Sequence, residues 1–392
     1  MKNARPLLLA ASSVALLISA CSTPANLDVP TLEPQFGTVD DDRATFVAVN
    51  SAHTYVYTAG VTSRLGDETL FLRRYNQDGS LSWERRSEPL DTLKVGGVGT
   101  DAAGNAYVAY SGTAATLSKR NKTGSLLWRK KLAADNTGYK GVYVAASVAD
   151  NAGNSYVALQ NYVNLDDANF DNGSQLRKYD TTGKLLWQRD FDDYEANFQD
   201  LAVASDGSLY SVSRKDDQET LLTKYGASGT TLWQVPIDAR TDLRVAVSGT
   251  TVYVAGGGYE AGTNTFNGLL TKYNAAGGRQ WQRVTGSFFI GGGISADSAG
   301  NVYLTETKAV SVVGESDYDL LVRKYTAAGA LSWTHQPKLS STKEYGEDVA
   351  VRNAGEIYTV GSTDGKVNGR NNGGLDAFLL RLNGQGNRVW SR

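Results

Sequence analysis

The sequence is poor in the side chains that carry out most metal and covalent chemistry. It has one cysteine, Cys21, one methionine at its start, and two histidines, His53 and His335, that lie 282 positions apart. Two such distant histidines argue against a histidine-based metal site or catalytic triad. A formal net charge of −2 argues against a nucleic-acid-binding protein, which needs a clustered basic face.

Catalytic sequence motifs are equally scarce. There is no Gly-x-Ser-x-Gly element and no phosphate-binding loop. Residues 97–102 match the loose dinucleotide-binding pattern, but no helix follows them, and Ser340 and Lys343 match Ser-x-x-Lys by count alone. We therefore predict no catalytic residue and no organic cofactor, and we favour a protein that is not an enzyme.

The first twenty residues are typical of an export signal. Lys2 and Arg5 precede an apolar stretch over 7–18, and residues 17–21 read Leu-Ile-Ser-Ala-Cys, which resembles a bacterial lipobox. A transmembrane anchor is one alternative, but the apolar stretch is shorter than the roughly 20 residues of a membrane-spanning helix. A plain secretory signal is the other, and it would make the position of the only cysteine a coincidence. We predict a lipoprotein signal peptide over 1–20 and acylation, palmitate included, at Cys21.

This reading predicts a lipid-anchored protein of the cell envelope. Ser22 follows the cysteine, and in lipoprotein families sorted by that position a residue other than Asp implies the outer membrane. We therefore favour the outer membrane or cell surface over the inner membrane. Residues 21–44 contain three prolines and many small polar side chains, so they predict an extended lipidated tether.

The rest of the chain is a sequence repeat. Each tryptophan holds the same place in it: Trp83, Trp128, Trp187, Trp233, Trp281, Trp333 and Trp390. A glycine lies four residues before each: Gly79, Gly124, Gly183, Gly229, Gly277, Gly329 and Gly386. A basic residue lies nine before each: Arg74, Lys119, Lys178, Lys224, Lys272, Lys324 and Arg381. Each repeat has an upstream tyrosine: Tyr55, Tyr107, Tyr156, Tyr210, Tyr253, Tyr303 and Tyr358. A second tyrosine, eight residues before the tryptophan, is replaced by Arg120 and Leu382 in two copies.

Each copy predicts four antiparallel strands, A to D, in a meander. Residues 180–183 read Asp-Thr-Thr-Gly between two apolar stretches, which suits a type I turn closed by a left-handed glycine bulge. A single four-stranded sheet cannot bury both its faces, but sheets stacked in a ring can. We predict an all-β, seven-bladed β-propeller over 45–392. An open β-solenoid and a pair of β-sandwiches are the alternatives, and the hairpin that ends every copy favours the propeller.

The last copy carries the clearest family resemblance. It reads Gly-Ser-Thr-Asp-Gly over 361–365 and Asn-Gly-Gly-Leu-Asp-Ala-Phe-Leu over 372–379, and it ends at Trp390. This resembles the bacterial β-propeller repeat labelled SBBP. The Gly-x-x-x-Trp hairpin is also similar to the tryptophan motif of PQQ-type propellers and of an outer-membrane assembly lipoprotein. The resemblance implies an extracytoplasmic propeller and no particular reaction.

The end of the chain gives one further expectation. In such repeats Gln-Phe-Gly-Thr commonly follows the tryptophan, and here that stretch is found at 35–38 instead. We expect residues 35–38 to lie against the end of blade seven and to help close the ring.

Length variation predicts where function lies. The stretch from the upstream tyrosine to the second-tyrosine position varies from 13 to 24 residues, whereas the last hairpin never changes length. The B–C and D–A loops therefore form a variable face, where binding is expected. Candidate partner-binding residues in these loops are Tyr162, Phe170, Tyr194, Tyr259, Phe266, Tyr318 and Tyr345.

The same face contains an acidic loop over 164–173. Asp166, Asp167 and Asp171 are candidate ligands for Ca²⁺, which prefers clustered oxygens. The loop fails as an EF-hand, because its glycine comes one place late and Lys178 stands where glutamate is needed. A solvated acidic loop without metal is the alternative.

Three functional hypotheses remain. The favoured one is a monomeric binding or scaffold protein whose variable face takes an envelope protein or a glycan. The second is a quinoprotein-like or polysaccharide-acting enzyme, which an acidic pair near the ring axis would favour. The third is an accessory lipoprotein of envelope assembly. The seven basic residues are interpreted as structural, with buried stems and heads placed in water or against an aromatic ring.

Overall fold

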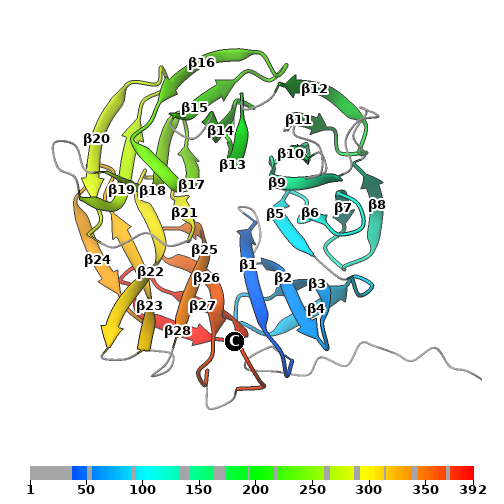
Figure 1. Cartoon of the computed structure of the whole chain (residues 1–392), viewed down its shortest axis with the longest axis vertical. Coiled ribbons are helices and arrows are strands. Elements are labelled where there is room, and N and C mark those ends of the chain that lie inside the picture. The colour runs from blue at the N-terminus through cyan, green and yellow to red at the C-terminus, as the bar shows by residue number, and fades with distance from the viewer. Residues whose placement is uncertain are drawn as a thin grey trace, which may run out of the picture.

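The computed structural model shows seven four-stranded blades arranged as a ring around a central channel (Figure 1). The structure describes residues 38–392 except 51–54, 91–92, 133–140, 163–172, 193–194, 216–218, 260–264, 287–291, 313–314, 338–342 and 368–370. Cys21, the signal peptide and most of the predicted tether lie outside the described residues.

Each blade contributes one strand to each of four concentric positions. The A strands, nearest the axis, are β1 (Asp42–Val49), β5 (Lys94–Thr100), β9 (Gly141–Ala149), β13 (Asn197–Val203), β17 (Ala239–Ser248), β21 (Ile294–Ala296) and β25 (Glu344–Asn353). The B strands are β2 (Val56–Arg64), β6 (Ala106–Ser111), β10 (Ser155–Tyr162), β14 (Leu209–Lys215), β18 (Thr251–Tyr259), β22 (Val302–Val312) and β26 (Glu356–Thr363). The C strands are β3 (Asp67–Tyr75), β7 (Thr116–Arg120), β11 (Ser174–Tyr179), β15 (Glu219–Tyr225), β19 (Phe266–Tyr273), β23 (Glu315–Tyr325) and β27 (Asp376–Leu382). The D strands, on the outer edge, are β4 (Leu81–Arg86), β8 (Leu126–Lys131), β12 (Leu185–Phe191), β16 (Thr231–Pro236), β20 (Arg279–Val284), β24 (Leu331–His335) and β28 (Arg388–Ser391).

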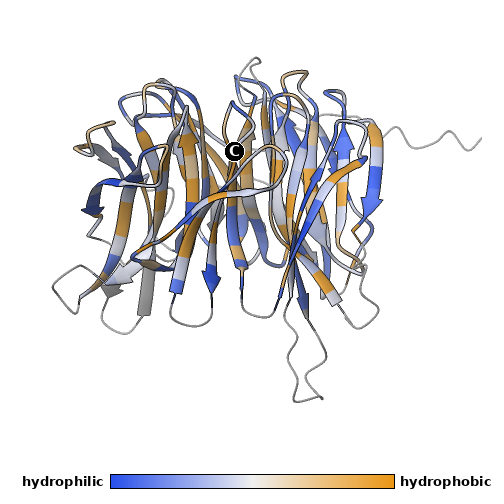
Figure 2. Ribbon diagram, turned by 90° about the horizontal axis from the view of Figure 1, so that it is seen from above, coloured by the Kyte–Doolittle hydropathy of each residue, from blue (hydrophilic) through white to orange (hydrophobic). Residues whose placement is uncertain are grey.

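The chain order is the strand order in every sheet. All neighbouring strands are antiparallel, so each blade is the predicted meander. The strands run from one face of the ring to the other, and apolar and polar residues alternate along them (Figure 2). The prediction of a seven-bladed propeller is confirmed.

The C–D turn is the most regular feature of the ring. In each blade the amide of its glycine donates to the carbonyl three residues before it, as Gly183 does to Asp180. All seven glycines have φ between 80° and 84°, the left-handed region that suits glycine, and a register shift follows at each hairpin. The predicted type I turn with a glycine bulge is confirmed.

Each blade is fastened to the next through its tryptophan. Every indole N–H donates to a carbonyl in the following blade's C–D turn, at 2.9 to 3.3 Å. A Cβ on the turn glycine would lie only 2.9 to 3.1 Å from that tryptophan ring. Glycine is therefore required at this position for two reasons: the backbone φ is positive, and the indole lies too close for a Cβ.

The tyrosine and the basic residue of each repeat complete this contact. The strand-B tyrosine packs on the tryptophan of its own blade, with ring centroids 5.9 to 6.3 Å apart. In blades two to seven the basic head lies 4.9 to 5.9 Å from that tyrosine ring. Several heads also donate to the next blade's turn, as Lys272 does to Ala327 at 2.9 Å. The structural interpretation of the basic residues is confirmed.

Blade one corrects one assignment. Tyr57, not Tyr55, takes the place of the strand-B tyrosine, because Tyr57 lies opposite Arg74 and packs on Trp83. Tyr55 instead lies beneath the Arg74 guanidinium, 3.5 Å from it. Two tyrosines two residues apart face the same side of a strand, so spacing alone did not separate them.

The ring closes without strand exchange among the described residues, since blade one comes entirely from the N-terminal strands and blade seven from the C-terminal ones. Trp390 donates to Gln77 at 3.1 Å, as at every other junction. Of the segment 35–38 only Thr38 is described, and its hydroxyl donates to Ser63 of blade one. The backbone of Val39, next in the chain, lies against Gly373 of blade seven.

Two glycines separate the effect of φ from that of the tryptophan contact. Gly249 has φ +59° and nothing within 4 Å of a Cβ, whereas a Cβ on Gly229 would lie 2.9 Å from Trp187. We expect Gly249→Ala to lower the free energy of unfolding by about 1 kcal/mol, through φ alone. Gly229→Ala should cost about 2–3 kcal/mol, because Trp187 must also shift. Urea unfolding measures both, and equal costs would contradict the contact.

Candidate functional site

The antiparallel blades place the B–C and D–A loops on one face of the ring, as expected. We call it the variable-loop face. Of the predicted binding residues, Phe170 and Tyr194 lie outside the described residues, and of Tyr162 only the backbone, at the end of β10, is described. The Ca²⁺ candidates Asp166, Asp167 and Asp171 also lie outside them. In the described part of the chain, no group of three or more His, Cys, Asp or Glu side chains could hold a metal ion.

The other four aromatic candidates form two pairs. Tyr259 and Phe266 flank the B–C loop of blade five and meet edge to face, with centroids 5.3 Å apart. Tyr318 of blade six and Tyr345 of blade seven meet across the blade boundary at 5.2 Å. Tyr259 is 53% exposed, so the Tyr259–Phe266 pair presents an aromatic surface to solvent.

A cavity of about 750 Å³ occupies the central channel and is lined mainly by A strands. Its first layer lies at the variable-loop end. Strand register defines this layer, because each of its A-strand residues pairs with the B-strand residue four positions after the strand-B tyrosine. The residues at this register are Arg43, Lys94, Tyr143, Asn197, Thr241 and Tyr345, and the first four of them line the cavity. The mouth of the channel therefore combines cations, an amide and an aromatic ring, and the carboxylates of Asp242 and Glu347 line the same cavity.

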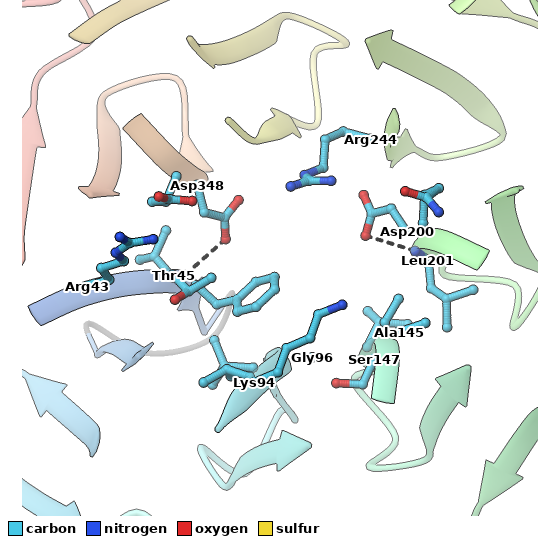
Figure 3. Close-up of a pocket in the computed structure, with 18 of the residues that line it drawn as sticks. Arg43, Thr45, Lys94, Gly96, Ala145, Ser147, Asp200, Leu201, Arg244 and Asp348 are labelled. Atoms are coloured by element: carbon cyan, nitrogen blue, oxygen red, sulfur yellow. Dashed lines mark hydrogen bonds between the residues drawn. The ribbon is translucent and has the colours of Figure 1, made fainter. Parts of the chain in front are cut away.

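A second layer lies deeper, after the bulge that interrupts most A strands. In the first three blades it holds uncharged residues, namely Phe46, Gly97 and Ala146. It holds charged ones in three others, namely Asp200, Arg244 and Asp348. Figure 3 shows the Arg244 guanidinium reaching toward the axis between the two carboxylates, with the Lys94 ammonium also pointing into the channel.

Both carboxylates of the second layer are held by backbone amides. Asp348 accepts from Val47 of blade one at 3.0 Å and from Val349 at 2.8 Å. Asp200 accepts in the same way from Val245 of blade five, at 2.9 Å, and from Leu201. Each therefore links its blade to the next around the axis. Burial raises the pKa of Asp348 to about 7, and burial, partly offset by Arg244, raises that of Asp200.

Lys94 presents its ammonium group to the channel (Figure 3). Its ammonium lies 4.7 Å from the centre of the Tyr143 ring, and the side chain is exposed. Partial burial of the Lys94 ammonium within the channel, and then the charge of Arg244, lower the pKa of Lys94. Among the described residues no carboxylate forms an ion pair with Lys94, so an anionic group entering the channel would relieve this repulsion.

Sequence reasoning missed every charged residue of the channel. The sequence did contain a signal for these residues, because one strand-A position is charged in some copies of the repeat and uncharged in others. It could not be aligned by counting, because bulges shift the register of most A strands and the A–B turn has two residues in blades five and seven but five in most others.

Comparison with known proteins places the chain in a family. The profile described as outer membrane protein assembly factor BamB matches residues 33–169 and 171–287, well over half of the chain. The chain belongs to this family. The PQQ-type resemblance is thereby confirmed, while no finding bears on the SBBP label. No curated protein sequence matches the chain.

Solved structures share the fold alone. Hydrazine synthase of Kuenenia stuttgartiensis is 10% identical, with a TM-score of 0.55 over 86% of this chain and 95% of that one. The β-propeller domain of the Trilobed protease of Pyrococcus furiosus is 8% identical, with a TM-score of 0.54 over 90% and 96%. Polysaccharide lyase Uly1 is 10% identical, with a TM-score of 0.51 over 87% and 90%. Among the described residues of our chain, none forms a helix long and apolar enough to span a membrane.

The two kinds of buried aspartate predict opposite pH effects. The folded protein holds the Asp348 proton more tightly than the unfolded chain, so this group destabilises the fold as pH rises from about 4 to about 7. Despite burial, hydrogen bonds from Asn105 and Tyr107 and the charge of Lys119 lower the pKa of Asp101, so its contribution is lost as pH falls below about 4.

The asparagine variants test these signs. Relative to Asp348→Asn, the wild-type free energy of unfolding should fall as pH rises from about 4 to about 8. Relative to Asp101→Asn, it should instead rise as pH increases from about 3 to about 5. Unfolding curves across this range measure both, and the same sign for the two variants would contradict the assigned environments.

Proposed function

We propose that this protein is a lipid-anchored binding scaffold of the cell envelope that holds a partner protein at the channel mouth of its variable-loop face. The observation that carries the proposal is the composition of that mouth. Four of its lining positions share one register, yet they hold Arg, Lys, Tyr and Asn side chains, whereas the opposite face repeats one turn in all seven blades. Residues that bind a partner are often found among the variable positions of a rigid scaffold, whereas the residues that build the scaffold change little.

The chemistry of the mouth favours a segment with an acidic group. Lys94 and the exposed Arg43 supply positive charge, and Tyr143 supplies an aromatic wall. The exposed Tyr259 and the Tyr318–Tyr345 pair, on the same face, extend the contact surface. Aromatic and basic side chains of this kind dominate the energetics of protein interfaces. A glycan is the alternative ligand that these residues also suit.

Family membership favours a role in envelope assembly as the specific form of this function. The matching family is described as an outer membrane protein assembly factor. A propeller tethered by an acylated Cys21 would present the channel mouth to an assembly partner close to the membrane. The channel gives weaker support to catalysis, because both oxygens of Asp200 and of Asp348 already accept backbone amides.

Photo-crosslinking in cells tests the binding face. A photoreactive side chain replaces Asn197 at the mouth or, as a matched control, Ser228 in a C–D turn; both positions are exposed. We expect discrete protein adducts from position 197 and none of the same mass from 228. The additional change Lys94→Gln should reduce the adduct several-fold. Identical adducts from both faces would exclude the variable-loop face as the specific site.

Fractionation tests the anchor. Cys21→Ser removes the thiol that acylation requires, so the variant should neither incorporate labelled palmitate nor gain the mass of an acylated N-terminus. The wild-type chain should do both and should sediment with the outer-membrane fraction. An unchanged mass in the wild-type chain would show that Cys21 is not acylated.

A further inference from the structure

Blade two departs from the repeat along its C–D hairpin, which ends at the outer edge of the ring. Arg120 stands where five other blades have a tyrosine. Between Asp101 and Asp135 the chain contains no acidic residue and six basic ones: Lys119, Arg120, Lys122, Arg129, Lys130 and Lys131. The corresponding hairpin of blade four, residues 223–236, has a single basic residue, so the repeat itself does not require this charge.

Two of the six cations are used by the fold. Lys119 pairs with Asp101 at 3.4 Å and donates to Thr181, and the Lys130 stem packs beside Gly183 of blade three. The remaining four are Arg120, Lys122, Arg129 and Lys131. Lys122, Arg129 and Lys131 are exposed and Arg120 is half-buried. Within the part of the chain that the structure describes, none of these four forms an ion pair with a carboxylate.

The cations are crowded where blade two meets blade one. Arg120 Nη1 and Arg85 Nε donate to the same acceptor, the carbonyl oxygen of Gly124, at 3.0 and 3.2 Å. Partial burial, and then the charges of Arg129 and Arg85, lower the pKa of Arg120. Glu84 of the neighbouring strand is already paired with Arg73 and Arg86. The cluster therefore carries unneutralised positive charge, which a bound anion would stabilise.

Apolar side chains lie directly beside these cations. Leu126 and Leu127 of β8 are 44% and 50% exposed, and Leu185 and Leu186 of β12, in the next blade, are 41% and 49% exposed. Both strands lie on the outer edge of the ring (Figure 1). Exposed leucines among lysines and arginines are typical of surfaces that insert into the headgroup region of anionic bilayers.

We propose that the outer edge of blade two docks on an anionic phospholipid surface. Arg120, Lys122, Arg129 and Lys131 bind lipid phosphates, and Leu126 and Leu127 enter the headgroup region. The leucines favour a bilayer over a soluble polyanion, because a polyanion gains nothing from apolar contact. Docking by an outer strand sets the ring axis roughly along the membrane plane, so the variable-loop face stays open to a partner.

Vesicle binding tests this proposal without the lipid anchor or any partner. The chain from Ser22 onward keeps all 28 strands and lacks Cys21. We expect it to sediment with phosphatidylglycerol-containing vesicles and not with pure phosphatidylcholine vesicles, and to be released by high salt. Arg129→Gln with Lys131→Gln should weaken binding about tenfold or more, since each cation near such a surface contributes to affinity.

Three comparisons make the result specific. Arg64→Gln with Lys366→Gln removes the same charge at exposed positions elsewhere and should leave binding nearly unchanged. Leu126→Ser with Leu127→Ser should weaken binding although charge is kept. Arg120→Tyr, which restores the repeat residue, should also weaken binding. Thermal unfolding of each variant confirms that it is folded.

Several outcomes would overturn the proposal. These are equal sedimentation with both kinds of vesicle, an equal loss in the charge variant and its matched control, or full binding by the folded leucine variant. The last result would show that charge alone drives binding, as it would with a soluble polyanion. None of these outcomes bears on crosslinking at the channel mouth, so the two proposals fail separately.

Discussion

The indole N–H of each tryptophan donates to a carbonyl of the next blade's C–D turn, and the whole ring depends on this contact. It fixes the five-residue turn, because another length would move the carbonyl, and it fixes the turn glycine, because a Cβ would meet the indole. The tyrosine and the basic residue then brace the tryptophan from within its own blade. The face that carries the C–D turns is therefore taken up by contacts that hold neighbouring blades together.

Because that face is fixed, specific function is best sought where the copies differ. The channel departs from the repeat through Lys94, Arg244 and the two aspartates, and the outer edge of blade two departs through Arg120 and its neighbours. The first departure creates a polar cavity and the second an exposed cationic and apolar edge. Neither set of residues is needed to build a blade, because other blades form without it.

Much of the fold could be read from the sequence because its determinants are local. The hairpin turn, the tryptophan, the glycine and the basic residue are all within ten positions of one another, so a fixed spacing identifies them. Tyr57 was missed because Tyr55 lies just before the same strand, two residues away, and only strand register separates the two. The channel residues were missed because bulges and unequal A–B turns destroy fixed spacing, and because facing side chains come from blades that are distant in sequence.

The direct test of this account is the junction where the two chain ends meet. Among the described residues no strand is shared between blades one and seven, so we expect the contact of Trp390 with Gln77 to hold them as firmly as Trp187 holds blade four. Native-state hydrogen exchange of Trp390→Phe and Trp187→Phe measures this. We predict similar losses of protection, equivalent to about 1–2 kcal/mol, on the two blades flanking each site. Unchanged protection at the junction in Trp390→Phe would contradict the account.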